Sequence, residues 1–250
     1  MFHLAAFGGL QNPNVTFLPI APIPDQQIPN NQNNQFIMPS NVQIWAAYML
    51  GGNLIRGRIN NPTLRQVGLP DIFPFSRGNT NPSLAQLDYL YGFGPVLPKN
   101  DPLEIDTSTD AGAVTSNWAF VWLSDQNRNV PVGPAYKIHA TSPGAAAPGF
   151  TWQPQALTVD QVLPYGTYSI VGMQCQAVNM LAGRLIFVGG GWRPGTLAVN
   201  AVGDQPNPLF QSGNLGEFGR FESNAQPSAE IIANGAVGTV NWYLDLVKIA

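Results

Sequence analysis

Glycine and proline recur so often along this chain that long helices are excluded. The 250 residues include 26 glycines and 23 prolines, and a proline inside a helix removes a hydrogen bond and clashes with the preceding turn. Between these breaks lie short runs rich in β-branched and aromatic residues, the pattern of strands bounded by turns. The sequence therefore predicts an all-β sandwich whose strands are joined by long, irregular loops.

Three segments show the clearest strand patterns. Residues 103–109 alternate apolar or threonine side chains with acidic and polar ones, which indicates a half-buried strand. Trp118 to Leu123 is apolar on both faces and is expected at the centre of a sheet. Val240 to Ile249 is so apolar that we expect it to be inserted in a sheet as well.

Charged side chains are few. The chain has 11 basic and 14 acidic residues, fewer than the surface of a soluble monomer normally carries, so we expect other subunits to cover part of it. The net charge of −3 gives no general attraction to nucleic acid or to an anionic membrane. Cys175 is the single cysteine, which excludes an internal disulfide and a thiolate zinc site. No signal peptide and no membrane span are expected.

Residues 1–40 form a distinct region in which prolines alternate with asparagine and glutamine. Asp25 is its only acidic residue, and it has no lysine or arginine. Two interpretations are open: a disordered tail, or an extended arm whose apolar side chains lie in grooves of a neighbouring subunit. A solvated tail should be poor in apolar residues, which favours the arm. The apolar contact candidates in it are Phe7, Phe17, Ile20 and Phe36.

Residues 41–250 are expected to form a single domain with a loop-rich insertion at about 51–100. That insertion is basic, and its contact candidates are Arg56, Arg58 and Arg65. Lysine is nearly absent, so we expect these arginines to pair with carboxylates across a subunit boundary rather than to bind phosphate.

The sequence contains few residues and motifs typical of catalysis, so no enzyme activity and no cofactor are expected. His139 lies in a predicted strand, and no nucleophile elbow, phosphate-binding loop or dinucleotide motif is present. Gly189 to Gly191 lacks the lysine of a phosphate loop, so it is interpreted as a turn that lets Trp192 pack. Four carboxylates are close in sequence: Asp101, Glu104, Asp106 and Asp110. They fit the polar face of a strand, and the sequence leaves open whether they bind a metal ion or form a glycosidase pair.

The tryptophans divide into two groups. Trp118, Trp122 and Trp242 are expected in the core. Trp152 and Trp192 lie beside prolines and are expected at a ligand site or a subunit contact, together with Arg193.

Three features together resemble a viral jelly-roll capsid protein of a bacteriophage-like icosahedral virion: the uncharged arm, the strands joined by Gly/Pro loops, and the closing strand. The resemblance covers roughly residues 100–250, in the segments Leu163 to Val178, Arg184 to Pro194 and Val240 to Ile249. It implies a sandwich of about eight strands whose loops and arm contact neighbouring subunits. A double jelly roll usually needs a longer chain, so one barrel with insertions is expected.

The expected function is therefore that of a structural virion protein that self-assembles into an icosahedral shell. Its partners would be copies of itself and other virion proteins. In many such families the arm is strongly basic and binds the genome, and this arm is not, so direct nucleic-acid binding is not expected; nothing supports membrane contact. The alternative is a carbohydrate- or receptor-binding β-sandwich module, such as a fibre head or a lectin-like trimer. A hydrolase that uses Glu104 and Asp106 is a third hypothesis.

Overall fold

The computed structural model describes residues 2–12, 16–24, 31–32, 35–66, 75–77, 88–89, 95–110, 112, 114–125, 129–145, 149–199 and 208–250. In these ranges the chain is mainly strand, with one short α-helix, α1 (Pro62–Gln66), and a 3-10 helix, η2 (Pro208–Phe210). The predicted all-β fold class is confirmed.

The chain divides into two compact units. Unit 1 contains residues 1–3, 81–84 and 127–250, and unit 2 contains residues 4–80 and 85–126. The predicted boundary after residue 40 is not a boundary between these units, because the residues on both sides of it belong to unit 2. That residues 41–250 form a single domain stays a prediction.

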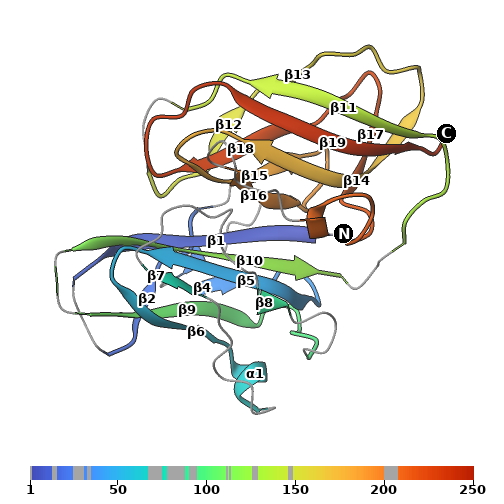
Figure 1. Ribbon diagram of the computed structural model, residues 1–250. Helices are drawn as coiled ribbons and strands as arrows, with labels where there is room; N and C mark the ends of the chain where they lie inside the picture. The colour runs from blue at the N-terminus through green and yellow to red at the C-terminus, as the bar shows by residue number, and fades with distance from the viewer. Residues whose placement is uncertain are drawn as a thin grey trace. The chain divides into compact units, whose positions relative to one another are not determined.

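Unit 2 contains two sheets that lie in separate layers (Figure 1). The first has the order β1 (Phe2–Gln11), β10 (Thr115–Ser124), β5 (Gln43–Gly51) and β7 (Phe75–Arg77), and β8 (Asp88–Tyr89) also pairs with β5. The second has the order β2 (Leu18–Ile20), β9 (Pro102–Thr109), β4 (Gln35–Ile37) and β3 (Asn31–Gln32), and β6 (Leu54–Asn60) also pairs with β9.

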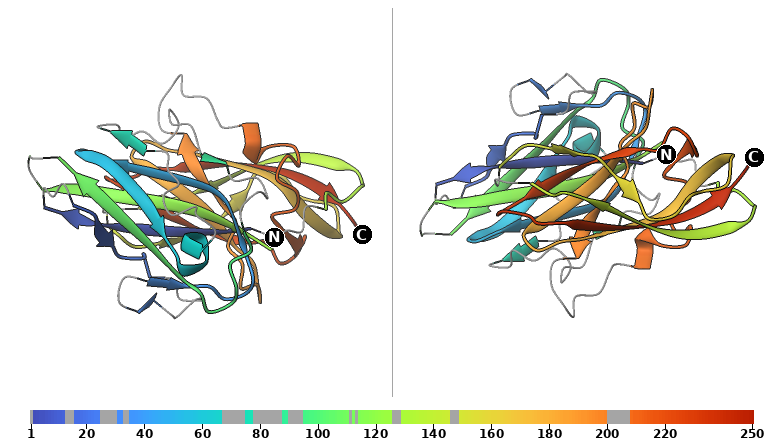
Figure 2. Two further views of the ribbon diagram at one scale, coloured as in Figure 1. Left: turned by 90° about the horizontal axis from the view of Figure 1, so that it is seen from below. Right: turned by 90° about the horizontal axis from the view of Figure 1, so that it is seen from above.

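Much of the predicted arm is part of these sheets. Strand β1 lies alongside β10 (Figure 2), while β2 and β4 pair with β9. Their apolar side chains fill the core of unit 2: Phe7 is fully buried and its ring lies edge-on to that of Phe36, with 6.4 Å between centroids. Ile20 is buried as well. The groove that these side chains occupy is therefore formed by their own chain.

Strand β10 is central in its sheet, as its two-sided apolar pattern predicts. It lies between β1 and β5, and its register with β5 runs from Asn117 opposite Gly51 to Ser124 opposite Gln43. Trp118 and Trp122 are both buried, which confirms their predicted place in the core.

Unit 1 is built on one continuous succession of strands. Its order is β12 (Gln153–Gln155), β18 (Ser228–Ala233), β15 (Met180–Ile186), β16 (Gly195–Val199), β14 (Thr167–Gln176), β19 (Val240–Lys248), β11 (Ala135–Ser142) and β13 (Thr158–Val159), and β17 (Gly219–Glu222) pairs with β14. Strands β14 and β16 are parallel and pair only at Cys175 and Gln176. This short parallel pairing divides the strand order into two halves, one from β12 to β16 and one from β14 to β13. The closing strand β19 lies between β14 and β11, as predicted.

In the core of unit 1 an indole ring packs directly against the backbone of a glycine. Trp242 is fully buried, as predicted, and its indole lies against the backbone of Gly183 in β15. A Cβ atom at Gly183 would lie 2.5 Å from Trp242 Cη2 and 2.6 Å from Met180 Cε. The position therefore admits only glycine without repacking.

Gly183→Ala should destabilise the protein by about 1–3 kcal/mol, because it overpacks the core of unit 1. The measurement is a urea titration that follows tryptophan fluorescence. The matched control is Gly238→Ala, where an added Cβ meets nothing within 4 Å and the change should stay within about 0.5 kcal/mol. Equal urea midpoints for the two variants would contradict the packing of Trp242 against Gly183.

Candidate contact surface and groove

The loop between β15 and β16 depends on glycines for its conformation. Gly189 has a φ of 71°, in the left-handed region that favours glycine, and a Cβ at Gly191 would meet nothing within 4 Å. The following Trp192 is half-buried, and its ring lies edge-on to that of His3, with 6.3 Å between centroids. The glycine-rich turn thus lets Trp192 pack while one side of it stays accessible.

Beside this loop lies a groove of about 370 Å³. It is lined by Phe187, Val188, Gly189, Gly190, Gly191, Trp192, Phe218, Gly219 and Arg220. Phe187 lies directly over Gly219, where a Cβ would come within 2.6 Å of its ring. Aromatic rings, glycine backbone and one guanidinium therefore form the walls.

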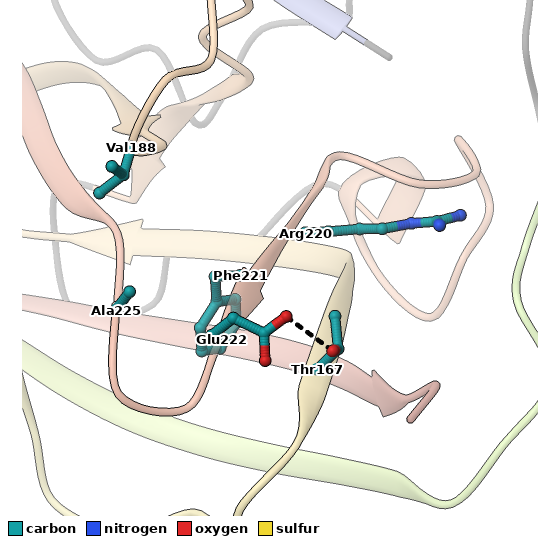
Figure 3. A pocket seen from close by; sticks show the side chains of 6 residues that line it. All are labelled: Thr167, Val188, Arg220, Phe221, Glu222 and Ala225. Carbon is teal, nitrogen blue, oxygen red and sulfur yellow. Dashed lines mark hydrogen bonds between the residues drawn. The ribbon is translucent and has the colours of Figure 1, made fainter.

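A second hollow, of about 300 Å³, shares Val188 and Arg220 with the groove (Figure 3). Across its floor, the Thr167 hydroxyl donates to Glu222 Oε1 at 2.7 Å. Arg220 is fixed by Glu217, whose Oε2 accepts from Arg220 Nη2 at 3.0 Å. The hydrogen bond to Glu217, together with the charge of that carboxylate, raises the pKa of the Arg220 guanidinium.

Residues 187–194 and 222–225 contribute to the lining of this hollow, and residues 160–166 lead into Thr167, which lines it as well. We call these three segments the three-loop end of unit 1. Residues 160–166 and 222–225 are tied together, because Ser223 N donates to Gly166 O at 2.9 Å and Gly166 N donates to Ser223 Oγ at 3.2 Å. Two large apolar side chains of these segments are exposed: Tyr165, which precedes Gly166 in the chain, by 84%, and Val188, which lines the hollow, by 85%. An exposed apolar side chain at the rim of a hollow is available for an interaction surface.

A buried ion-pair cluster holds the glycine-rich loop between β15 and β16 on the sheet. Glu230 of β18 accepts from Arg184 Nε at 2.7 Å, and its other oxygen lies 2.6 Å from Arg193 Nη1. All three side chains are nearly inaccessible to solvent. The guanidinium of Arg184 also lies 3.9 Å from the centre of the Trp152 ring. Trp152 is buried inside unit 1, which does not fit the ligand site or subunit contact expected for it.

The predicted contact residues of unit 2 form a separate cluster. The half-buried Phe17 ring lies under Arg58, 4.4 Å from its guanidinium carbon, and 5.1 Å from that of Arg56. Arg58 Nε donates to Asp106 at 2.7 Å. Arg65 is exposed at the end of α1. Of the predicted residues, Phe17, Arg56 and Arg58 are thus brought together, whereas Trp192 and the buried Arg193 belong to unit 1.

The carboxylates in β9 and just before it accept hydrogen bonds from neighbouring amides, one hydroxyl and the Arg58 guanidinium. Glu104 accepts from Gln35 at 2.6 Å and from Asn60 at 2.8 Å. Asp101 accepts from Asn61 at 2.9 Å and from Thr63 at 2.8 Å. Among the described residues no group of three His, Cys, Asp or Glu side chains is placed to hold a metal ion.

Sequence reasoning missed two parts of this region. Glu230 interrupts an otherwise apolar strand, and a lone acid in such a run is a signal of a buried ion pair. Tyr165 lies in a Pro-Tyr-Gly turn, which predicts its exposure but not the hydrogen bonds that tie the next residue, Gly166, to Ser223.

No family model, no curated protein and no solved structure matches this chain. Within the part of the chain that the structure describes, no helix is long and apolar enough to cross a membrane.

Glu230→Gln should destabilise the protein by about 3–5 kcal/mol, because it removes the carboxylate between two buried guanidinium groups. Thermal and urea unfolding would measure the loss. Glu222→Gln is the matched control, since Glu222 is exposed and its change should cost less than about 1 kcal/mol. Similar losses in the two variants would contradict the anchoring role of Glu230.

Proposed function

We propose that this chain is a structural protein that self-assembles into the shell of an icosahedral virion, and that it is built from two jelly rolls in tandem. The supporting observation is that the same strand-pairing order occurs twice. A jelly roll has eight strands in two sheets. In one sheet the first strand pairs with the eighth, the eighth with the third and the third with the sixth. In the other sheet the second strand pairs with the seventh, the seventh with the fourth and the fourth with the fifth.

Unit 1 contains all six of these pairings if the two-residue edge strand β13 is set aside. One half has β11 with β19, β19 with β14 and β14 with β17. The other half has β12 with β18, β18 with β15 and β15 with β16. The first and last strands of the unit are thus neighbours, as the jelly-roll order requires.

Unit 2 repeats five of the six pairings among its described residues if β3, β4 and the parallel pairing of β7 with β5 are set aside. In one sheet β1 lies beside β10, β10 pairs with β5 and β5 pairs with β8. In the other, β2 and β6 both pair with β9. This proposal replaces the single barrel of about eight strands that the resemblance implies, because strands from the predicted arm and insertion join β5, β9 and β10 to make a second set.

The chemistry of the surface supports a shell rather than an enzyme. Jelly rolls serve as rigid tiles in viral capsids, and contacts between unlike surfaces of identical copies can close into rings. With few charges available, such contacts would be apolar and amide-rich. Tyr165 and Val188 at the three-loop end offer exposed apolar area for one of them.

Purified protein should form closed particles or ordered arrays that electron microscopy and light scattering detect. Tyr165→Asp combined with Val188→Asp should reduce assembly by more than about tenfold, because each carboxylate must be desolvated in the contact, while the circular dichroism spectrum stays unchanged. Val178→Asp, another exposed valine at 64%, is the control and should assemble normally. A protein that stays monomeric under all assembly conditions would overturn the proposal.

The groove favours a second candidate function, a carbohydrate- or receptor-binding module. Phe187, Trp192 and Arg220 line the groove, and sugar binding requires such a combination of aromatic and polar groups. For this function we expect a small trimer that binds defined glycans on an array, and Trp192→Ala should abolish that binding. A closed particle without glycan binding would exclude it.

A further inference from the structure

Three segments of unit 1 meet at His139 on β11. Its Nδ1 forms a hydrogen-bonded ion pair with Asp160 Oδ2, just beyond β13. Its Nε2 lies 3.1 Å from Asn241 Oδ1 on β19. On the same strand, Tyr243 lies opposite His139 with 5.1 Å between ring centroids. One imidazole thus connects two paired strands and the loop at their edge.

Both atoms that face the ring nitrogens are acceptors. A neutral imidazole has one N–H and can donate to only one of them, whereas an imidazolium donates to both. We propose that His139 is a proton-operated clamp: the doubly protonated ring holds the loop after β13 on the sheet through its ion pair with Asp160, and loss of one proton leaves at most a neutral hydrogen bond there and loosens that loop.

The clamped loop is residues 160–166, the first loop of the three-loop end. Its backbone is attached at both ends, by Asp160 N donating to His139 O at 3.1 Å and by Thr167 N donating to Ala250 O at 2.9 Å. Between these points Leu163 is buried, whereas Val162 and Tyr165 are exposed. Loss of the ion pair therefore loosens the loop without detaching it.

The surrounding charges favour the protonated ring. Asp160 is the carboxylate in contact with His139, and its hydrogen bond is the main cause that raises the pKa of His139 above 6.5. Burial opposes this shift, and Asn241 and the charge of Asp160 add to it. Nearby, Lys137 of β11 pairs with Asp245 of β19 at 3.5 Å, so that cation is compensated.

The sign of the pH effect follows from the raised pKa. The stabilisation is fully present below 6.5, the ordinary pKa of histidine, and is lost as the pH rises through the higher value in the folded protein. Both partners are partly exposed, His139 by 31% and Asp160 by 48%, so the effect should be local. We therefore expect the amide protection factors of residues 158–163 to fall by about two- to fivefold.

The experiment combines a titration with hydrogen exchange on the full chain. Histidine ring resonances, assigned with His139→Gln, report the pKa, because the chain has only two histidines. Protection factors between about pH 5.5 and 9, corrected for the intrinsic exchange rate, report the loop. The expected result is a pKa above 6.5 and protection that falls through it.

Two aspartate variants separate the clamp from a general pH effect. Asp160→Asn should lower the pKa of His139 and leave the loop at its low protection at every pH. Asp101→Asn is the matched control: the same change in unit 2, where Asp101 contacts Asn61 and Thr63, should alter neither readout. A pKa at or below 6.5, or loop protection that does not depend on pH, would overturn the clamp whether or not the protein forms a shell.

Discussion

The fold of each unit depends on backbone hydrogen bonds that its last strand makes with strands far earlier in the chain. In unit 1, β19 is paired on one side with β11 and on the other with β14, so Val240 lies opposite Ser142. In unit 2, β10 takes the same position between β1 and β5. Neither sheet is complete until these strands are in place, because a central strand left out exposes unpaired amides and carbonyls on both neighbours.

This arrangement also determines where chemistry and contacts can lie. Strands that pair over long sequence distances bring the loops between them to common ends, which is how residues 160–166, 187–194 and 222–225 come together. The Glu230 ion pairs lie beneath the loop that carries the exposed Val188, because Arg193 of that loop pairs with Glu230 of β18. His139 adds a titratable link between the sheet and the loop at residues 160–166. Among the described residues, several charged groups pair with one another inside a unit, as Arg184 and Arg193 do with Glu230.

The sequence predicted strands well where side-chain patterns are local. Alternation over residues 103–109 and the two-sided apolar run from Trp118 to Leu123 both correspond to observed strands, β9 and β10. The apolar residues of the predicted arm were a correct signal of burial, because Phe7, Ile20 and Phe36 are buried. Composition cannot say which groove buries a side chain, however, and here it is a groove of the same chain.

Taken by itself, the sequence determined the all-β class, the loop-rich connections, the burial of Trp118, Trp122 and Trp242, and the place of the closing segment in a sheet. These follow from local properties: glycine and proline prevent long helices, and apolar strands must be covered. Only the tertiary structure decided which strands pair, how the chain divides into two units, and which exposed side chains share a surface. Those outcomes depend on contacts between residues about a hundred positions apart, which short-range patterns do not encode.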